Sequence, residues 1–145
     1  MPYLRVNQVE HYYEWVGTET PHSPNSSRPV LVFIHGWAGS ARYWESTARV
    51  LAPHYDCLLY DMRGFGRSQI ADDQASLVAE RGYDLSTFAE DLAQLLAALG
   101  ISKVTLNAHS MGASIAVFFI NRYSHLVDRA ILTCNGIFEI GRAHV

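Results

Sequence analysis

Residues 108–112 read Ala-His-Ser-Met-Gly, between an apolar run typical of a strand and a longer apolar run typical of a helix. Residues 103–107 (Lys-Val-Thr-Leu-Asn) predict a short buried strand, and residues 111–123 predict a helix with small residues in its first turn. A chain that passes from strand to helix through one residue must turn sharply there, at a cost of roughly 1–3 kcal/mol in backbone conformation. We therefore expect Ser110 at a strained turn, with its hydroxyl raised above its neighbours at the end of a sheet.

Small residues lie two positions before and two positions after Ser110. Ala108 and Gly112 would let the strand and the helix cross closely. The same turn would aim the first free N–H groups of the helix at an oxygen bound beside Ser110. Taken alone, the pentapeptide leaves open that Ser110 only caps the helix, because Ser is a favoured N-cap residue.

Two other apolar runs end in turns that contain glycine. Residues 29–34 (Pro-Val-Leu-Val-Phe-Ile) are followed by His-Gly-Trp at 35–37, and residues 55–60 are followed by Asp-Met-Arg-Gly-Phe-Gly-Arg-Ser at 61–68. Together with the pentapeptide, this ordered set resembles the α/β-hydrolase superfamily, in the branch that uses a serine nucleophile. The resemblance covers nearly all of residues 3–138.

The resemblance implies a nucleophile and an oxyanion hole. Ser110 would attack the substrate, and the backbone N–H groups of Trp37 and Met111 would bind the oxyanion of the tetrahedral intermediate. Both donors are physically reasonable, because Met111 opens a helix and Trp37 follows a glycine. Ala108 departs from the family, which more often has Gly there, but the position requires small volume and Ala provides it.

Other residues near these turns would support the loops or line the substrate pocket. His35 and Gly36 are expected to shape the first loop, with His35 hydrogen-bonded to its own turn, and Gly112 to support the serine turn. The indole of Trp37 is a candidate for the pocket wall. His109 adjoins Ser110, but neighbouring side chains at a tight bend point apart, so we expect it to line the pocket rather than act as general base.

The second glycine turn favours a structural role over cofactor binding. Asp61 and Arg63 are expected to tie down the turn through Gly64 and Gly66, and the segment lacks the third glycine of a dinucleotide-binding motif. The remaining histidines do not have the spacing of metal ligands. The sequence therefore predicts no cofactor and no metal.

Strands that alternate with helices predict an α/β fold: a mostly parallel sheet of about six strands with helices on both faces. The fold would be a truncated α/β-hydrolase core without its lid and C-terminal strands. The further expected elements are two antiparallel strands within 3–16 around Asn7-Gln8, a polar loop at 17–29, a helix at 41–51, a surface excursion at 69–83, a helix at 87–99 capped by Thr87 and Glu90, and a strand at 128–134.

Composition narrows the classes of partner. The chain has 145 residues, a net charge of −3 and scattered basic residues, which argues against nucleic-acid binding. The longest apolar run, 115–120, is far shorter than the ~20 residues needed to span a bilayer, and the N-terminus does not resemble a signal peptide.

Cys57 and Cys134 fall in strand-like runs and are expected to be buried free thiols. We expect a cytoplasmic protein with a small-molecule substrate and no membrane partner; the sequence does not indicate its oligomeric state.

The acid and the histidine of a catalytic triad are not evident. After Ser110 the chain offers only Asp128, Glu139, His125 and His144. Asp128 and His125 are expected far from the serine turn, Glu139 adjoins a suspected non-native tail, and His144 falls within it. We therefore expect residues 1–139 to be the N-terminal part of a larger core domain. Residues 140–145 (Ile-Gly-Arg-Ala-His-Val) match one reading frame of a common sequencing adapter, and we expect them to be a non-native tail. The fragment by itself is expected to lack useful turnover.

The favoured function is hydrolysis of a small carboxylic ester, thioester or lactone. Branches of the superfamily that use a serine at this turn for carbon–carbon bond hydrolysis or for cofactor-free lyase chemistry remain alternatives. A non-catalytic small-molecule receptor of the same fold is another, and a complete structural module is a third. Dehalogenase and epoxide-hydrolase branches use Asp at this position, and Ser110 argues against both.

Overall fold

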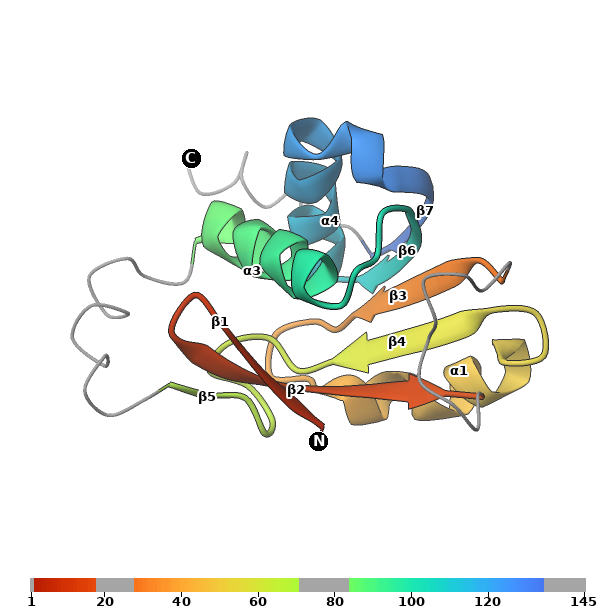
Figure 1. The fold of residues 1–145 in the computed structure, drawn as a ribbon, viewed down its shortest axis with the longest axis horizontal. Coiled ribbons are helices and arrows are strands. Elements are labelled where there is room, and N and C mark those ends of the chain that lie inside the picture. The colour runs from red at the N-terminus through yellow and green to blue at the C-terminus, as the bar shows by residue number, and fades with distance from the viewer. Residues whose placement is uncertain (1, 18–27, 71–83, 135–145) are drawn as a thin grey trace.

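The computed structural model describes residues 2–17, 28–70 and 84–134. Its centre is one sheet with the strand order β1-β2-β4-β3-β6-β7, and β5 pairs with β2 (Figure 1). The strands are β1 (Tyr3–Val6), β2 (Val9–Val16), β3 (Val30–Ile34), β4 (Asp56–Tyr60), β5 (Gln69–Ile70), β6 (Val104–His109) and β7 (Val127–Thr133). The four strands β4, β3, β6 and β7 run parallel, and β1, β2 and β5 form the antiparallel side. The predicted α/β fold with a mostly parallel sheet is confirmed.

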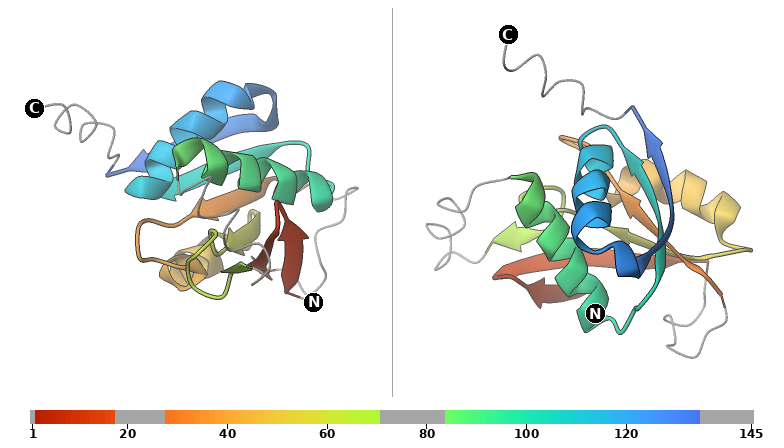
Figure 2. Two further views of the ribbon diagram at one scale, coloured as in Figure 1. Left: turned by 90° about the vertical axis from the view of Figure 1, so that its left-hand side faces the viewer. Right: turned by 90° about the horizontal axis from the view of Figure 1, so that it is seen from above.

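Helices cover both faces of the sheet, as predicted (Figure 2). One face carries the 3-10 helix η1 (Ala41–Trp44) and α1 (Glu45–Leu51), and the other carries α3 (Leu85–Ala98) and α4 (Met111–Arg122). Another 3-10 helix, η3 (Ser124–Leu126), joins α4 to β7.

The alternation of side chains along β3 divides the core into two layers. Leu31 and Phe33 pack toward η1 and α1, while Val32 and Ile34 pack toward α3 and α4. Every residue of β3 is buried. Such a strand reads as a continuous apolar run because it is covered on both sides.

The start of α3 differs from the prediction. The capping box was expected at Thr87, but the helix begins at Leu85, after Asp84. The Asp84 carboxylate accepts a hydrogen bond from the Thr87 N–H at 2.7 Å, so Asp84 is the N-cap. The earlier start also adds Leu85 to the residues that pack on the core.

The two ends of the sheet are covered to different degrees. The β1–β2 hairpin turns at Asn7 and Gln8, both with positive φ, as expected. At the other edge β7 is mostly exposed, and 53% of the Ile131 surface is accessible to solvent.

Both cysteines are free, as predicted, and Cys57 is buried. The prediction that Cys134 is buried was wrong, because β7 ends at Thr133 and Cys134 lies exposed beyond it.

Several expectations fall on residues outside the described part. These include most of the 17–29 loop, residues 71–83 of the excursion, and the segment from 135 on, with Glu139 and His144. Within the excursion, residues 69–70 form β5 rather than irregular chain.

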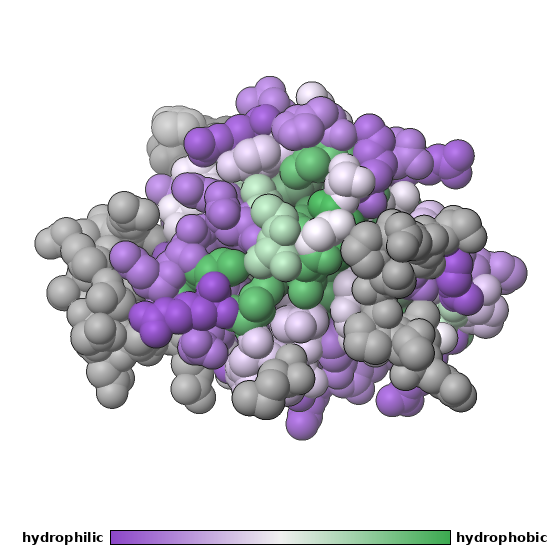
Figure 3. All heavy atoms as spheres, viewed as in Figure 1, coloured by the Kyte–Doolittle hydropathy of each residue, from purple (hydrophilic) through white to green (hydrophobic). Residues whose placement is uncertain are grey.

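Apolar residues gather near the centre of the face seen in Figure 3, and hydrophilic residues surround them. Among the helices of the described residues, none has the length and apolar character needed to cross a bilayer.

Candidate active site

Ser110 lies between β6 and α4 in the sharp turn that the sequence predicts. Its φ is 56° and its ψ is −123°, a conformation that non-glycine residues rarely adopt. The Ser110 N–H donates to the Thr133 carbonyl at 3.0 Å, and the Ser110 carbonyl accepts from the Ala113 N–H at 2.9 Å. The turn is thus anchored to β7 on one side and to α4 on the other. The half-buried side chain makes no capping hydrogen bond with the helix, which argues against the reading of Ser110 as a simple N-cap.

Small residues let α4 approach the end of β3. A Cβ atom at Gly112 would lie 2.5 Å from the carbonyl oxygens of both Ile34 and His35, closer than real contacts allow. Ala108 is fully buried and pairs with Ile34 across the β6–β3 ladder. The predicted close crossing of strand and helix is therefore present.

The loop after β3 passes beside the serine. A Cβ atom at Gly36 would lie 3.2 Å from the Ser110 Cβ and 3.7 Å from its Oγ. Among the described residues, neither the Trp37 N–H nor the Met111 N–H donates a hydrogen bond to another protein group. Two unused backbone donors therefore lie on the loop and the helix that border Ser110.

His35 joins this loop to the one that follows β4. The ring is fully buried; its Nδ1 lies 2.8 Å from the Gly36 carbonyl oxygen, and its Nε2 accepts a hydrogen bond from the Met62 N–H at 3.0 Å. Burial lowers the pKa of His35, an effect that outweighs the opposing influence of the Gly36 hydrogen bond and the Asp61 charge. The expected bond of His35 to its own turn is present, and the bond to Met62 adds a second contact.

Asp61 holds the loop at 61–68, as expected. Its Oδ1 accepts from the Ala41 N–H at 2.6 Å and its Oδ2 accepts from the Arg67 N–H at 2.8 Å. Gly66 has φ +53°, and a Cβ there would lie 2.4 Å from Asp61 Oδ2. The turn therefore requires glycine at this position.

Arg63 does not bind this turn, which corrects the prediction. Its guanidinium makes two hydrogen bonds to Asp91 of α3, at 2.5 and 2.7 Å. Asn7 donates to the same carboxylate at 3.0 Å, and the His11 Nε2 lies 3.5 Å from it. This buried cluster connects the β1–β2 hairpin, the loop after β4, and α3. No role was predicted for Asp91 from the sequence, although an acidic residue among the apolar positions of a helix is a detectable signal.

His109 contacts an aromatic ring and not the serine. It stacks on Tyr43 with ring centroids 5.3 Å apart and an interplanar angle of 20°, and its Nδ1 lies 3.4 Å from Thr133 Oγ1. Among the described residues, His109 has no hydrogen bond to Ser110. This geometry does not favour His109 as a general base.

Aromatic rings lie on the segments next to the turn, and two of them are exposed. Trp37 is 68% exposed and meets Phe65 edge-on with centroids 5.2 Å apart, and Tyr43 is 55% exposed. Trp37 was predicted to line the pocket from its motif, whereas no local sequence motif pairs Tyr43 with His109 or Phe65 with Trp37.

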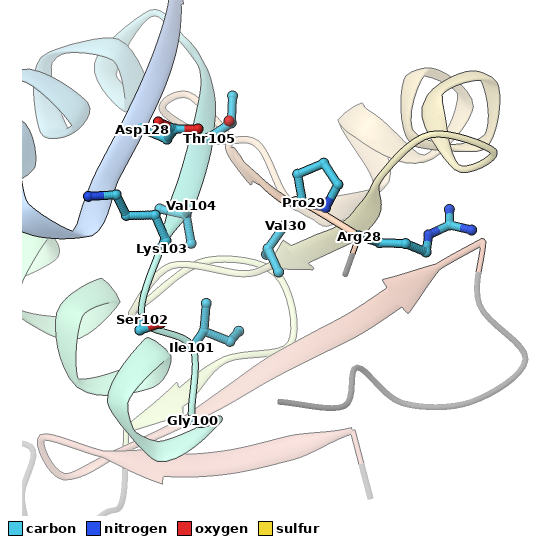
Figure 4. A pocket seen from close by; sticks show the side chains of 10 residues that line it. All are labelled: Arg28, Pro29, Val30, Gly100, Ile101, Ser102, Lys103, Val104, Thr105 and Asp128. Atoms are coloured by element: carbon cyan, nitrogen blue, oxygen red, sulfur yellow. The ribbon is translucent and has the colours of Figure 1, made fainter. Parts of the chain in front are cut away.

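His125 and Asp128, which follow Ser110 in the sequence, lie at the opposite end of the sheet. His125 lies in η3 and Asp128 near the start of β7, whereas Ser110 follows the end of β6. Asp128 lines a hollow of about 270 Å³ with Lys103 and Val30, where β7, β6 and β3 begin. These three side chains are labelled in Figure 4. Neither His125 nor Asp128 can serve Ser110. Among the described residues, no group of three or more His, Cys, Asp or Glu side chains could hold a metal ion.

Comparisons with known proteins agree with this geometry. A family model described as the alpha/beta hydrolase fold matches residues 29–144. A probable lysophospholipase L2 from Haemophilus influenzae is 31% identical over 107 residues, which are 73% of this chain and 34% of that protein. Epoxide hydrolase 1 from Caenorhabditis elegans is 26% identical over 92% of this chain and 30% of its own length. The crystal structure of a bacterial membrane phospholipase A superimposes with a TM-score of 0.76 at 30% identity, covering 92% of this chain and 38% of that one. The chain thus spans about a third of the length of these relatives.

Proposed function

The chain belongs to the α/β-hydrolase fold family, and on that premise we propose that the complete protein hydrolyses a small carboxylic ester, thioester or lactone with Ser110 as its nucleophile. The observation that carries the proposal is the conformation of Ser110: a strained turn with φ 56° whose hydroxyl makes no capping bond. Such strain persists only where the surrounding structure enforces it, and it is concentrated at functional sites.

The proposed chemistry uses the serine and two backbone donors. Ser110 Oγ attacks the substrate carbonyl carbon while its proton passes to a general base, and the carbonyl oxygen gains negative charge. The N–H groups of Trp37 and Met111 would stabilise that oxyanion. Collapse of the intermediate expels the alcohol, thiol or ring oxygen and leaves an acyl-enzyme, which water hydrolyses. Loss of one oxyanion donor typically costs about 10²–10³ in kcat.

The substrate class is supported by the relatives and by the surface around the serine. Two of the similar proteins are named as a lysophospholipase and a phospholipase A, names that point to ester substrates. The exposed rings of Trp37 and Tyr43 would contact an apolar acyl or leaving group. The base and the acid are proposed to lie outside the described residues.

A fluorophosphonate probe tests the nucleophile. The protein expressed from its complete open reading frame should label, Ser110→Ala should abolish labelling, and Ser102→Ala should not affect it, because Ser102 is exposed at the opposite end of the sheet. Labelling that persists in Ser110→Ala, or a wild-type protein that does not label, would overturn the assignment, and the second result would favour a receptor.

Labelling at Ser110 without hydrolysis of p-nitrophenyl acetate or butyrate would instead favour carbon–carbon bond hydrolysis or lyase chemistry. The nucleophile assignment and the ester specificity are thereby tested separately.

A further inference from the structure

The two contacts of the His35 ring determine where its proton resides. The Met62 backbone N–H can only donate, so His35 Nε2 must accept with its lone pair. The Gly36 carbonyl oxygen can only accept, so Nδ1, 2.8 Å away, must carry the hydrogen. His35 is therefore neutral and protonated at Nδ1.

The Gly36 carbonyl is held by two donors at once. His35 Nδ1 donates to it, and so does the Gly39 N–H at 3.1 Å. The peptide bond between Gly36 and Trp37 is trans, like every described peptide bond of the chain. In a trans peptide the C=O and N–H point in opposite directions. The direction of the Gly36 carbonyl therefore sets the direction of the Trp37 N–H, which points away from His35.

We propose that His35, as its neutral Nδ1–H tautomer, is a positioning residue that orients the Gly36–Trp37 peptide so that the Trp37 N–H faces an oxyanion formed beside Ser110. The position of Gly36 supports this role, because a Cβ there would lie 3.2 Å from the Ser110 Cβ. This inference rests on the proposed function, since it assumes that Ser110 is the nucleophile. It adds the requirement that the buried His35 ring be neutral, with its hydrogen on Nδ1.

Protonation of His35 at Nε2 would disrupt the hydrogen bond from the Met62 N–H, which joins the loop after β4 to the loop after β3. A hydrogen on Nε2 would face the Met62 N–H, so two donors would meet where one donor and one acceptor now pair. Among the described residues, Asp61 is the acidic group whose charge acts on the ring. Of the nearby cations, Arg63 is bound to Asp91, and Arg67 pairs with Asp61 at 3.5 Å. Burial prevails over Asp61 and keeps the pKa of His35 below its usual value.

The tautomer can be observed without any activity. In the complete protein labelled with ¹⁵N at histidine, we expect the His35 ring to show a proton on Nδ1 and none on Nε2 at pH 7. A proton on Nε2 at that pH, alone or with one on Nδ1, would overturn the inference.

Two substitutions test the two hydrogen bonds of His35 one at a time. In His35→Asn the side-chain N–H takes the place of Nδ1–H and can donate to Gly36, whereas in His35→Gln the amide oxygen takes the place of Nε2 and can accept from Met62. With p-nitrophenyl butyrate we expect His35→Gln to lower kcat about 10- to 100-fold with little change in KM, a smaller loss than removal of a whole donor. His35→Asn should retain kcat within about threefold, since it keeps the Gly36 bond. The exposed His54→Gln is the matched control and should be unchanged.

The outcomes distinguish this inference from the proposed function. Equal kcat losses in both variants, or wild-type kcat in His35→Gln, would overturn the positioning role even if Ser110 labels normally. Failure of Ser110 to label in the wild type would overturn both proposals.

Discussion

Gly112 of α4 lies against the end of β3 so closely that a Cβ atom would come within 2.5 Å of the Ile34 carbonyl oxygen. That oxygen belongs to the backbone of a buried strand and cannot move aside as a flexible side chain would. The first turn of α4 is therefore held against the loop that carries His35 and Gly36. The same contact keeps Ser110 next to that loop.

Gly112→Ala is expected to destabilise the protein by about 1–3 kcal/mol, the usual cost of forcing an extra methyl group into a packed site. Urea unfolding followed by circular dichroism measures the change. Asn121→Ala, at an exposed position of the same helix, is the control and should stay within about 0.5 kcal/mol of wild type. A neutral result for Gly112→Ala would show that α4 does not approach β3 as described.

The buried pair of Arg63 and Asp91 should show strong coupling. Removing one partner leaves a buried charge without compensation, which typically costs about 3–5 kcal/mol. We expect both Arg63→Met and Asp91→Leu to be destabilising by about this amount. The double variant should be considerably less destabilised than the sum of the two, and a double-mutant cycle in urea measures the difference.

The exposed Arg49→Met is the matched control for loss of an arginine. Additive effects of the two substitutions would contradict the close contact between Arg63 and Asp91.

Acid should weaken the fold partly through Asp91. Burial alone would raise the pKa of this carboxyl, but its interactions with nearby His11 and with the Arg63 guanidinium outweigh burial and hold the pKa below its usual value. A carboxyl with a lowered pKa contributes stability that is fully present above its unfolded pKa of about 4 and is lost as the pH falls through its folded value. Unfolding free energy should therefore decline below about pH 4.

Asp91→Asn should flatten that decline, because the variant has no carboxyl to protonate. Asp84 has a pKa lowered by its bonds to Ser86 and Thr87 but is exposed, so Asp84→Asn should alter the acid dependence less. If unfolding free energy declines below pH 4 as steeply in Asp91→Asn as in wild type, Asp91 does not contribute to the acid sensitivity.

The central strands were predictable from sequence because burial on both faces produces continuous apolar runs. β3, β4 and β6 begin within one residue of their predicted starts, and the glycine-bearing turns marked where two of them end. The turn at Ser110 was predictable for a related reason. Only residues 108–110 separate the predicted strand from the predicted helix, so the change of direction had to fall among them.

The features that the sequence did not predict correctly depend on contacts between residues far apart in the chain. Asp84 and Thr87 are both good N-cap residues three positions apart, and packing of Leu85 on the core favours the earlier start. The partner of Arg63 lies 28 residues away on α3, a distance at which no local pattern reports pairing. Tyr43 likewise reaches His109 only after η1 has folded against the end of the sheet.

The two cysteines should differ in reactivity. Cys57 is fully buried in β4, and burial raises the pKa of its thiol to about 11, so little thiolate is present at pH 8. Cys134 is exposed beyond the end of β7. With 5,5′-dithiobis(2-nitrobenzoic acid) at pH 8, we expect Cys134 to react within minutes and Cys57 only after denaturant is added. Cys134→Ser should abolish the fast phase and Cys57→Ser should leave it intact. Rapid reaction of both thiols in the native protein would contradict the burial of β4, and with it the two-sided packing that places the end of β3 beside Ser110.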